Sequence, residues 1–265
     1  MASLPVSFNV GLENDLTAYR ALAEERGVGL EIQHFADGSL MDGTWRDVAD
    51  SLKPVLSGFS GTLSLHGPNY PNLDPAAWDS GVQALARERY LLSMRIAHEL
   101  GARFVIFHCW YYPTMKYHGG VPGWLPRRAA TWKDLARSAE LLGVTVVLEN
   151  TWEPEPEAQS ALVDAVGSPA LKACLDTGHA TMTAATPVAE WVRQLGPRLA
   201  YVHAHSNCGR SDDHWGFTRG VLDAPALIRQ LAAMEKPPQV CLEMRSRDDH
   251  VASLDIVNKS LQVEA

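Results

Sequence analysis

The chain has 265 residues, of which 46% are hydrophobic and 20% are charged, and this composition is typical of a folded globular protein rather than a disordered one. Its 31 Asp and Glu residues outnumber its 23 Lys and Arg residues, so the net charge of −8 provides no broad basic field for nucleic acid or an anionic membrane. No uninterrupted apolar stretch reaches the roughly 18 residues of a membrane-spanning helix, which argues against membrane insertion.

The cysteines stand far apart and form no Cys-x-x-Cys pair, so the sequence predicts neither a disulfide framework nor a thiolate zinc site. The first residues also lack the basic segment and apolar run of a secretory signal. We therefore expect a cytoplasmic protein with reduced thiols.

Short β-branched or apolar runs alternate along the chain with longer segments of helical period, which is the pattern of repeated βα units. Most of the runs are too continuously apolar for a sheet with one face in water, which indicates buried parallel strands. The predicted strands cover residues 6–10, 29–33, 62–66, 103–107, 145–149, 171–176, 199–205 and 239–243.

The segments between these strands read as amphipathic helices. One has an apolar face over residues 82–100 and ends at Gly101, and another has such a face over residues 132–142 and ends at Gly143. Because no linker interrupts the series, we predict an α/β fold with a single (β/α)₈ TIM-barrel domain over residues 1–265. The alternative is an open doubly wound sheet, but residues 11–15 lack the Gly-rich phosphate loop of that fold.

Polar residues gather at the carboxyl ends of the predicted strands, where TIM barrels carry their chemistry. Of the 10 histidines, only His98 is expected within a helix. A single histidine at such a place more often has a structural role, but the whole set points to a shared function. The others are expected at or just beyond strand ends: His34, His66, His108, His118, His179, His203, His205, His214 and His250.

Glu149, Asp176, His205 and Glu243 end the last four predicted strands. Strand alternation directs their side chains toward the barrel axis, where carboxylates and imidazoles in a low dielectric require a cation among them. We predict that these residues bind a divalent metal. An oxygen-rich set with one nitrogen favours Mn²⁺, suits Mg²⁺ and also accepts Zn²⁺ or Co²⁺.

A second group of polar residues is expected at the same mouth. These side chains either extend the centre from the favoured single ion to two or three ions, or bind substrate hydroxyls, and the sequence does not choose between the two. They are His66, His108, His179, Asp212 and His214.

Four segments resemble the xylose isomerase-like TIM-barrel superfamily: Leu-Glu-Asn-Thr at 148–151, Cys-Leu-Asp-Thr-Gly-His-Ala at 174–180, His-Ala-His-Ser-Asn-Cys-Gly-Arg-Ser-Asp-Asp-His at 203–214 and Leu-Glu-Met at 242–244. This superfamily contains sugar and sugar-phosphate isomerases and epimerases, and also the endonuclease IV-type apurinic endonucleases (AP endonuclease family 2). The resemblance covers nearly the whole chain.

The resemblance implies one of two metal centres. As in the epimerase-like members, Glu149, Asp176, His205 and Glu243 would hold one metal, and the two glutamates would carry the proton. As in the endonuclease IV-like members, three zinc ions would be held by nine ligands, each of which has a match here: His66, His108, Glu149, Asp176, His179, His205, Asp212, His214 and Glu243.

Two features favour the isomerase side. Residues 206–208, which follow His205, differ from the Leu-Asn-Asp-Ser-Lys that follows this histidine in the endonucleases. Glu153, Glu155 and Glu157 lie beside the site, where they would repel a phosphate backbone. The alternative for these glutamates is a solvated helix start, where carboxylates are favourable.

Substrate-binding residues are expected at the same mouth. Trp110 and Trp152 offer rings that stack on a sugar or a base, and His108 offers a hydrogen-bonding group. Arg245 stands two residues after Glu243, so strand alternation directs both side chains inward, and Arg245 is a candidate to bind a substrate phosphate.

We predict a metal-dependent isomerase or epimerase that acts on a sugar or sugar phosphate through an enediolate. Glu149 and Glu243 would remove and return the proton, and His179 or His66 would polarise the carbonyl oxygen. The alternatives are an endonuclease IV-like phosphodiesterase acting on abasic DNA and a catalytically silent metal-binding barrel. The sequence disfavours nucleic acid and membrane partners. Barrels of this kind often form homodimers, but no apolar stripe in the sequence marks an interface.

Overall fold

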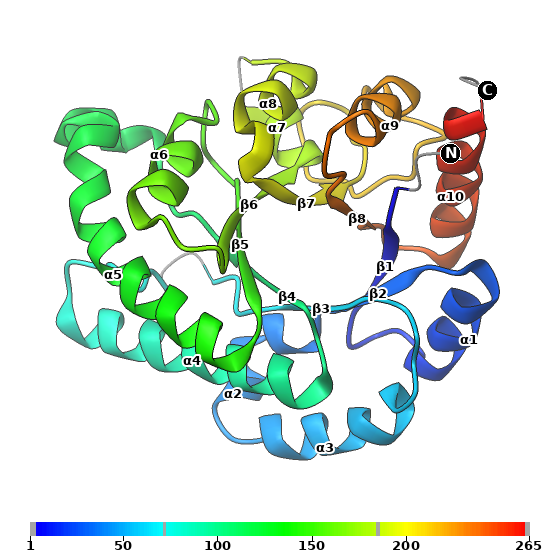
Figure 1. The fold of residues 1–265 in the computed structure, drawn as a ribbon, viewed down its shortest axis with the longest axis horizontal. Coiled ribbons are helices and arrows are strands. Elements are labelled where there is room, and N and C mark those ends of the chain that lie inside the picture. Colours follow the sequence, from blue (N-terminus) through cyan, green and yellow to red (C-terminus); the bar gives the residue numbers. More distant parts are fainter. Residues whose placement is uncertain (1–3, 71–72, 184–185, 263–265) are drawn as a thin grey trace.

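A computed structural model of the protein describes residues 4–70, 73–183 and 186–262. Within these residues the strands pair in chain order, each parallel to the next, and the last strand pairs with the first. The sheet is therefore a closed eight-stranded barrel with helices outside it (Figure 1). The predicted TIM barrel is confirmed, and the open doubly wound sheet is excluded.

Every predicted strand is present, and its ends differ from the prediction by at most one residue. His205 and Glu243 consequently lie one residue beyond their strands. The strands are β1 (Val6–Val10), β2 (Gly29–Ile32), β3 (Leu63–His66), β4 (Phe104–His108), β5 (Thr145–Glu149), β6 (Leu171–Asp176), β7 (Leu199–Ala204) and β8 (Gln239–Leu242).

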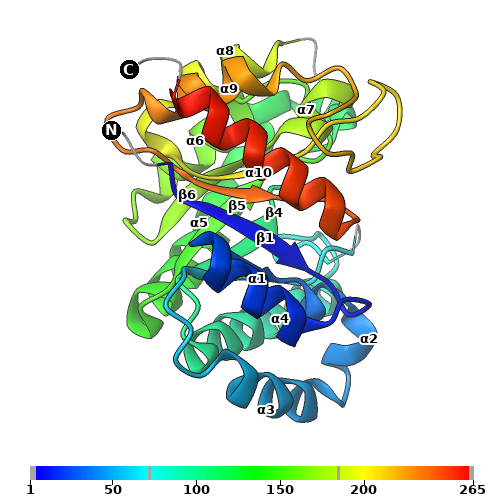
Figure 2. The ribbon, with the colours of Figure 1, turned by 90° about the vertical axis from the view of Figure 1, so that its right-hand side faces the viewer.

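The helices form an outer layer, and Figure 2 shows α1 and α10 outside the strands. Among the described helices, none combines the length and the apolar character needed to cross a membrane. The helices are α1 (Leu16–Arg26), α2 (Gly38–Met41), α3 (Trp45–Leu56), α4 (Ser80–Leu100), α5 (Gly120–Leu142), α6 (Glu157–Val166), α7 (Thr177–Thr183), α8 (Val188–Leu195), α9 (Ala224–Ala232) and α10 (Arg247–Gln262). Short 3₁₀ turns are η1 (His34–Ala36), η2 (Pro113–His118) and η3 (Gly196–Arg198).

The two long helices follow from local sequence signals. The Asp79 side chain accepts hydrogen bonds from the first main-chain N–H groups of α4, which satisfies donors that have no partner inside the helix. Gly101 and Gly143 end α4 and α5 with φ angles of 74° and 67°, a left-handed conformation that glycine adopts without strain. Both predicted helix ends are confirmed.

The barrel interior is divided by a layer of apolar side chains, which we call the interior layer: Phe104, Ile106, Val147, Cys174, Tyr201 and Cys241. A separate and larger apolar core joins the outer face of the strands to the helices. Because side chains alternate along a strand, inward positions above and below the interior layer remain for other groups. The carboxyl-end positions carry the predicted site.

The expectation that only His98 lies within a helix is wrong. His179 lies in α7 and His250 in α10, while His34 and His118 lie in 3₁₀ turns. His250 is fully buried, and its Nε2 lies 2.9 Å from the Leu242 carbonyl oxygen. Burial lowers the pKa of His250 to about 4, so this neutral histidine ties α10 to the barrel.

The start of β2 has no room for a side chain. A Cβ atom on Gly29 would lie 2.3 Å from the Thr62 carbonyl oxygen, which is main chain and cannot rotate away. We expect Gly29→Ala to lower the free energy of unfolding by about 1–3 kcal/mol, measured by urea denaturation. The control is Gly43→Ala, whose Cβ would meet nothing within 4 Å. Equal effects of the two substitutions would contradict this packing.

Candidate metal centre

A cavity of about 250 Å³ lies at the carboxyl end of the barrel. In Figure 2 the arrow of β1 points toward this end of the barrel, and the segment between β7 and α9 extends there. Asp176 and His205 are fully buried next to the cavity. The remaining predicted metal ligands line it, together with two predicted substrate-binding tryptophans: His66, His108, Glu149, His179, Asp212, His214, Glu243, Trp110 and Trp152.

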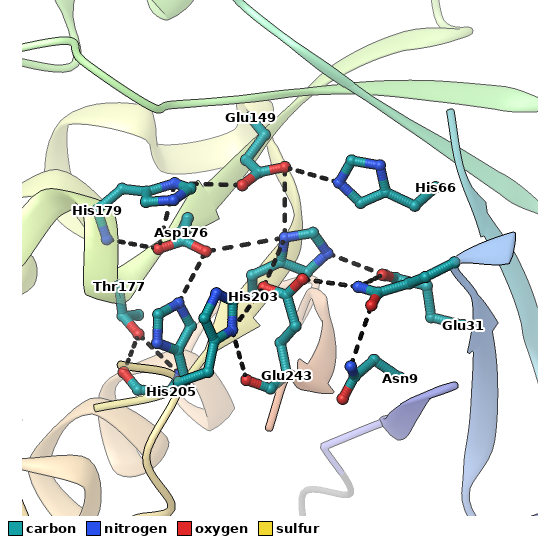
Figure 3. Close-up of polar contacts among 12 residues, drawn as sticks. Asn9, Glu31, His66, Glu149, Asp176, Thr177, His179, His203, His205 and Glu243 are labelled. Atoms are coloured by element: carbon teal, nitrogen blue, oxygen red, sulfur yellow. Dashed lines mark hydrogen bonds and ion pairs between the residues drawn. The ribbon is translucent and has the colours of Figure 1, made fainter. Parts of the chain in front are cut away.

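The four primary candidates lie in one network of polar side chains at the carboxyl end of the barrel (Figure 3). Asp176, His205 and Glu243 each offer a ligand atom, and these atoms all lie within 4.8 Å of one another. Glu149 forms a second such group with Asp176 and His179, so Asp176 belongs to both groups. This arrangement supplies the carboxylates and the imidazole that the sequence predicts for a divalent cation.

The junction between β6 and α7 is held by hydrogen bonds that fix Asp176. The Asn150 side chain donates to the Asp176 carbonyl and accepts from its N–H, at 3.0 and 2.8 Å. The N–H of His179 donates to Asp176 Oδ1 at 2.6 Å. A Cβ atom on Gly178 would lie 2.0 Å from His205 Cε1, so only glycine leaves room for this imidazole ring. The Asp-Thr-Gly-His segment therefore positions three candidate ligands.

The Glu149 carboxylate lies among imidazoles. His66 Nε2 and His179 Nδ1 each lie 3.3 Å from it, and His108 Nε2 lies 3.5 Å from it. Burial alone would raise the pKa of Glu149, but His203 and the other histidines around the carboxyl outweigh burial and hold the pKa well below its ordinary value. Glu149 is therefore an ionised carboxylate in a buried position.

Asp212 and His214, in the segment after β7, form a third group of candidate ligands with His205 and line the cavity. His214 Nε2 lies 3.1 Å from Asp212 Oδ2, and the His214 ring stacks on His205 with centroids 4.0 Å apart. Burial would lower the pKa of His214, but the carboxylates of Glu243 and Asp212 raise it to about 9. The same histidine has a φ of 52°, an uncommon backbone conformation at a candidate ligand.

Several buried polar atoms of the cluster have no hydrogen-bond partner within the described residues. Among the candidate ligands they include Nδ1 of His108 and His205, and Oδ1 of Asp212. Buried polar atoms are nearly always satisfied by a partner, and nitrogen and carboxylate oxygen atoms are the ligands of Mn²⁺ and Zn²⁺. The residues therefore fit a divalent cation.

A buried network beneath the cluster was not predicted from the sequence. The Glu31 carboxylate, in the middle of β2, accepts from Tyr201 Oη at 2.8 Å and lies 2.9 Å from His203 Nε2. Gln33 donates to both Glu31 and Glu243, at 2.9 and 2.7 Å. The sequence feature that could have revealed this network is Glu31 itself, an acidic residue inside an apolar strand, because such a residue is seldom buried without partners.

The predicted substrate-binding residues lie in different places. Trp110 is buried in the cavity wall and donates from Nε1 to Tyr90 Oη at 2.9 Å, while Trp152 is 49% exposed. His108 lies in the wall, and its ring is inclined by 63° to the Trp110 ring, with centroids 4.8 Å apart. Arg245 does not line the cavity; its exposed guanidinium donates to the Asp212 carbonyl at 3.0 Å.

The interpretation of Glu153 as an acidic group that repels phosphate is wrong. Glu153 is fully buried, and its carboxyl accepts hydrogen bonds from the main-chain N–H groups of Tyr111, Thr151 and Trp152. Burial raises the pKa of this carboxyl. It ties the loop after β5 to the loop after β4, and only Glu155 and Glu157 remain exposed.

Comparison with protein families gives a match over residues 20–263 to the family described as xylose isomerase-like TIM barrel. The chain belongs to this family. A relative in Methanocaldococcus jannaschii, the uncharacterized protein MJ1311, is 27% identical over 210 residues, which cover 76% of this chain and 70% of the relative. The resemblance seen in the sequence motifs is confirmed.

Solved structures agree with this fold. The TTHB071 protein from Thermus thermophilus, soaked with ZnCl₂, has a TM-score of 0.81 and 29% identity over 99% of both chains. A D-tagatose 3-epimerase-like protein has a TM-score of 0.80 and 23% identity over 98% of both chains. D-psicose 3-epimerase from Clostridium cellulolyticum, solved with D-tagatose, has a TM-score of 0.77 and 17% identity over 97% of this chain and 99% of that one.

Metal binding should release protons. His179 and His214 have pKa values above the ordinary value because the surrounding carboxylates outweigh burial, so both rings are protonated in the metal-free protein at neutral pH. A divalent cation bound by these same carboxylates would repel the positive charge of both rings and favour loss of their protons, so metal affinity should rise from about pH 6 to about pH 8. Calorimetric titration with Mn²⁺ or Zn²⁺ in buffers of different ionisation enthalpy measures both effects. A pH-independent affinity without proton release would contradict this assignment.

Proposed function

We propose that this protein is a metal-dependent isomerase or epimerase that acts on a sugar or sugar phosphate. The observation that carries the proposal is the position of two glutamates. The Glu149 and Glu243 carboxylates both line the cavity, and each lies 3.4 Å from the same atom, His203 Nδ1. Two carboxylates that converge on one small cavity suit the removal of a proton and its return.

Glu149, Asp176, His205 and Glu243 would hold the cation, with Mn²⁺ and a single ion favoured. When bound, such an ion polarises the oxygen atoms of a carbonyl and a neighbouring hydroxyl group. The donor set supports this role because its atoms gather within 4.8 Å in overlapping groups. The TTHB071 protein was soaked with ZnCl₂, which makes Zn²⁺ a second ion to test here beside Mn²⁺.

The chain's own groups would carry the proton. One glutamate takes the proton from the carbon next to the ketose carbonyl, and the other returns a proton to the opposite face. Glu149 is held as a carboxylate, which is the form that accepts a proton. Gln33 donates to Glu243 Oε1 at 2.7 Å and fixes the orientation of that carboxylate. His179 or His66, both in the cavity wall, would donate a hydrogen bond to the carbonyl oxygen.

The cavity favours a small substrate. At about 250 Å³ it falls below the roughly 300–1,000 Å³ typical of sites for larger ligands. The rings of Trp110 and Trp152, with His108, would contact the sugar. Solved structures with this fold include a D-tagatose 3-epimerase-like protein and a D-psicose 3-epimerase, which is consistent with a ketose as substrate.

One observation favours a second function. All nine residues that match the ligands of endonuclease IV-type enzymes lie in this one cluster, seven of them in the cavity wall. A phosphodiesterase with up to three metal ions is therefore the second candidate. The exposed carboxylates of Glu155 and Glu157, together with the net charge of −8, oppose contact with a DNA backbone.

Replacement of Glu243 tests the proton transfer. Metal-loaded wild-type protein should exchange deuterium from D₂O into a ketose such as D-tagatose, D-psicose or D-fructose and form its epimer, as followed by NMR. Glu243→Gln should reduce this rate by about 100-fold or more because the amide cannot act as a base. Glu155→Gln, which removes an exposed carboxylate, is the control. Full turnover by a metal-bound Glu243→Gln variant would contradict the mechanism.

A labelled duplex with one abasic site separates the two functions. We expect no cleavage by the metal-loaded protein. Cleavage by wild type that is lost in Glu149→Gln would instead establish the phosphodiesterase. A metal-loaded protein that leaves the abasic duplex and a broad panel of ketoses and ketose phosphates unchanged would be a catalytically silent metal-binding barrel, and this result would overturn the proposed activity.

A further inference from the structure

A second cavity lies at the opposite end of the barrel and has a volume of about 820 Å³. Its wall includes Thr145, Leu199 and Gln239, the first residues of β5, β7 and β8. Thr62 and Arg103, which directly precede β3 and β4, line it as well. We call this space the amino-end cavity.

The interior layer separates the amino-end cavity from the candidate metal centre. In β6 every second residue points inward: Lys172 lines the amino-end cavity, Cys174 belongs to the interior layer, and Asp176 belongs to the metal centre. The same order runs along β5 and β8, from Thr145 through Val147 to Glu149 and from Gln239 through Cys241 to Glu243. A ligand in one space therefore does not contact the other.

The polar groups in this wall have unused hydrogen-bonding capacity. Gln239 is only 4% exposed, and its Nε2 has no hydrogen-bond partner within the described residues. A buried amide that donates to nothing is costly, because buried polar atoms nearly always have a partner. Thr62 and Thr145 place two hydroxyl-bearing side chains in the same wall. These groups are suited to a polar head group.

The charges of the wall are mainly positive. Arg103, Lys172 and Lys236 line the cavity together with one acidic residue, Glu235. Across the described part of the chain, none of the three cationic groups forms an ion pair with a carboxylate. This excess of positive charge is local, since the whole protein has a net charge of −8. It favours an anion at this end of the barrel.

Apolar groups complete the wall. The Phe104 ring faces the cavity, with the Arg103 guanidinium 5.0 Å from its centroid, and Met234 and Pro197 also line the space.

We infer that the amino-end cavity binds a small organic anion with a phosphate or carboxylate head group and an apolar part. Arg103, Lys172 and the Gln239 amide would hold the head group, and Phe104 and Met234 would contact the apolar part. This inference is independent of the reaction proposed for the other end.

Calorimetric titration of the full-length, metal-loaded protein with phenyl phosphate and with benzoate tests the inference. We expect saturable binding of at least one probe at one site per chain, and the tighter probe identifies the preferred head group. Loss of a charge-assisted hydrogen bond in Lys172→Gln should weaken binding about tenfold or more. Lys133→Gln removes an exposed lysine of α5 outside the cavity and should leave binding unchanged.

Two further variants locate the site. Gln239→Leu should also weaken binding, and it tests the same site if Lys172→Gln does not fold. Glu149→Gln alters only the metal centre and should bind both probes as the wild type does. Absence of saturable binding by the wild type would overturn the inference. Equal losses in Lys172→Gln and Lys133→Gln would do so too, as would a loss confined to Glu149→Gln.

Discussion

The centre of the molecule depends on one imidazole ring shared by buried carboxylates. His203 Nδ1 lies 3.4 Å from both Glu149 and Glu243 and 3.9 Å from Asp176, while its Nε2 lies 2.9 Å from Glu31. Burial alone would lower the pKa of His203, but Glu243 and Glu31 outweigh burial and raise the pKa well above its ordinary value. Four carboxylates in a low dielectric would repel one another, and a positive charge among them relieves that repulsion. The candidate ligands remain close together for this reason.

The barrel brings these groups together by alternation of side chains. Along each of β5, β6 and β8, an inward residue near the amino end is followed by an apolar residue of the interior layer and then by an acidic residue at the carboxyl end or, for β8, directly after it. Parallel pairing in chain order puts all the carboxyl ends on one side. Residues distant in the sequence therefore meet in one cavity, and different chemistry is built at each end of one interior.

Sequence reasoning recovered the parts of the structure that follow from periodicity. The strands, their parallel order and the convergence of Asp176, His205 and Glu243 all follow from apolar runs that end in polar residues. It failed where a side chain's partners come from distant segments. Glu153 was interpreted as a solvated carboxylate because one of its donors, the Tyr111 N–H, comes from the distant loop after β4. Glu31 was not recognised because its partners His203 and Tyr201 lie on β7. The helical position of His250 was missed because α10 begins close after β8.

The central claim is that a divalent cation binds where the carboxylates and imidazoles converge. Anomalous diffraction from crystals of the protein grown with Mn²⁺, with data collected near the manganese absorption edge, measures this directly. The account predicts an ion within bonding distance of Glu149, Asp176, His205 and Glu243, at roughly 2.0–2.3 Å. An ion bound elsewhere, or an ordered cluster without any anomalous signal at saturating Mn²⁺, would contradict it.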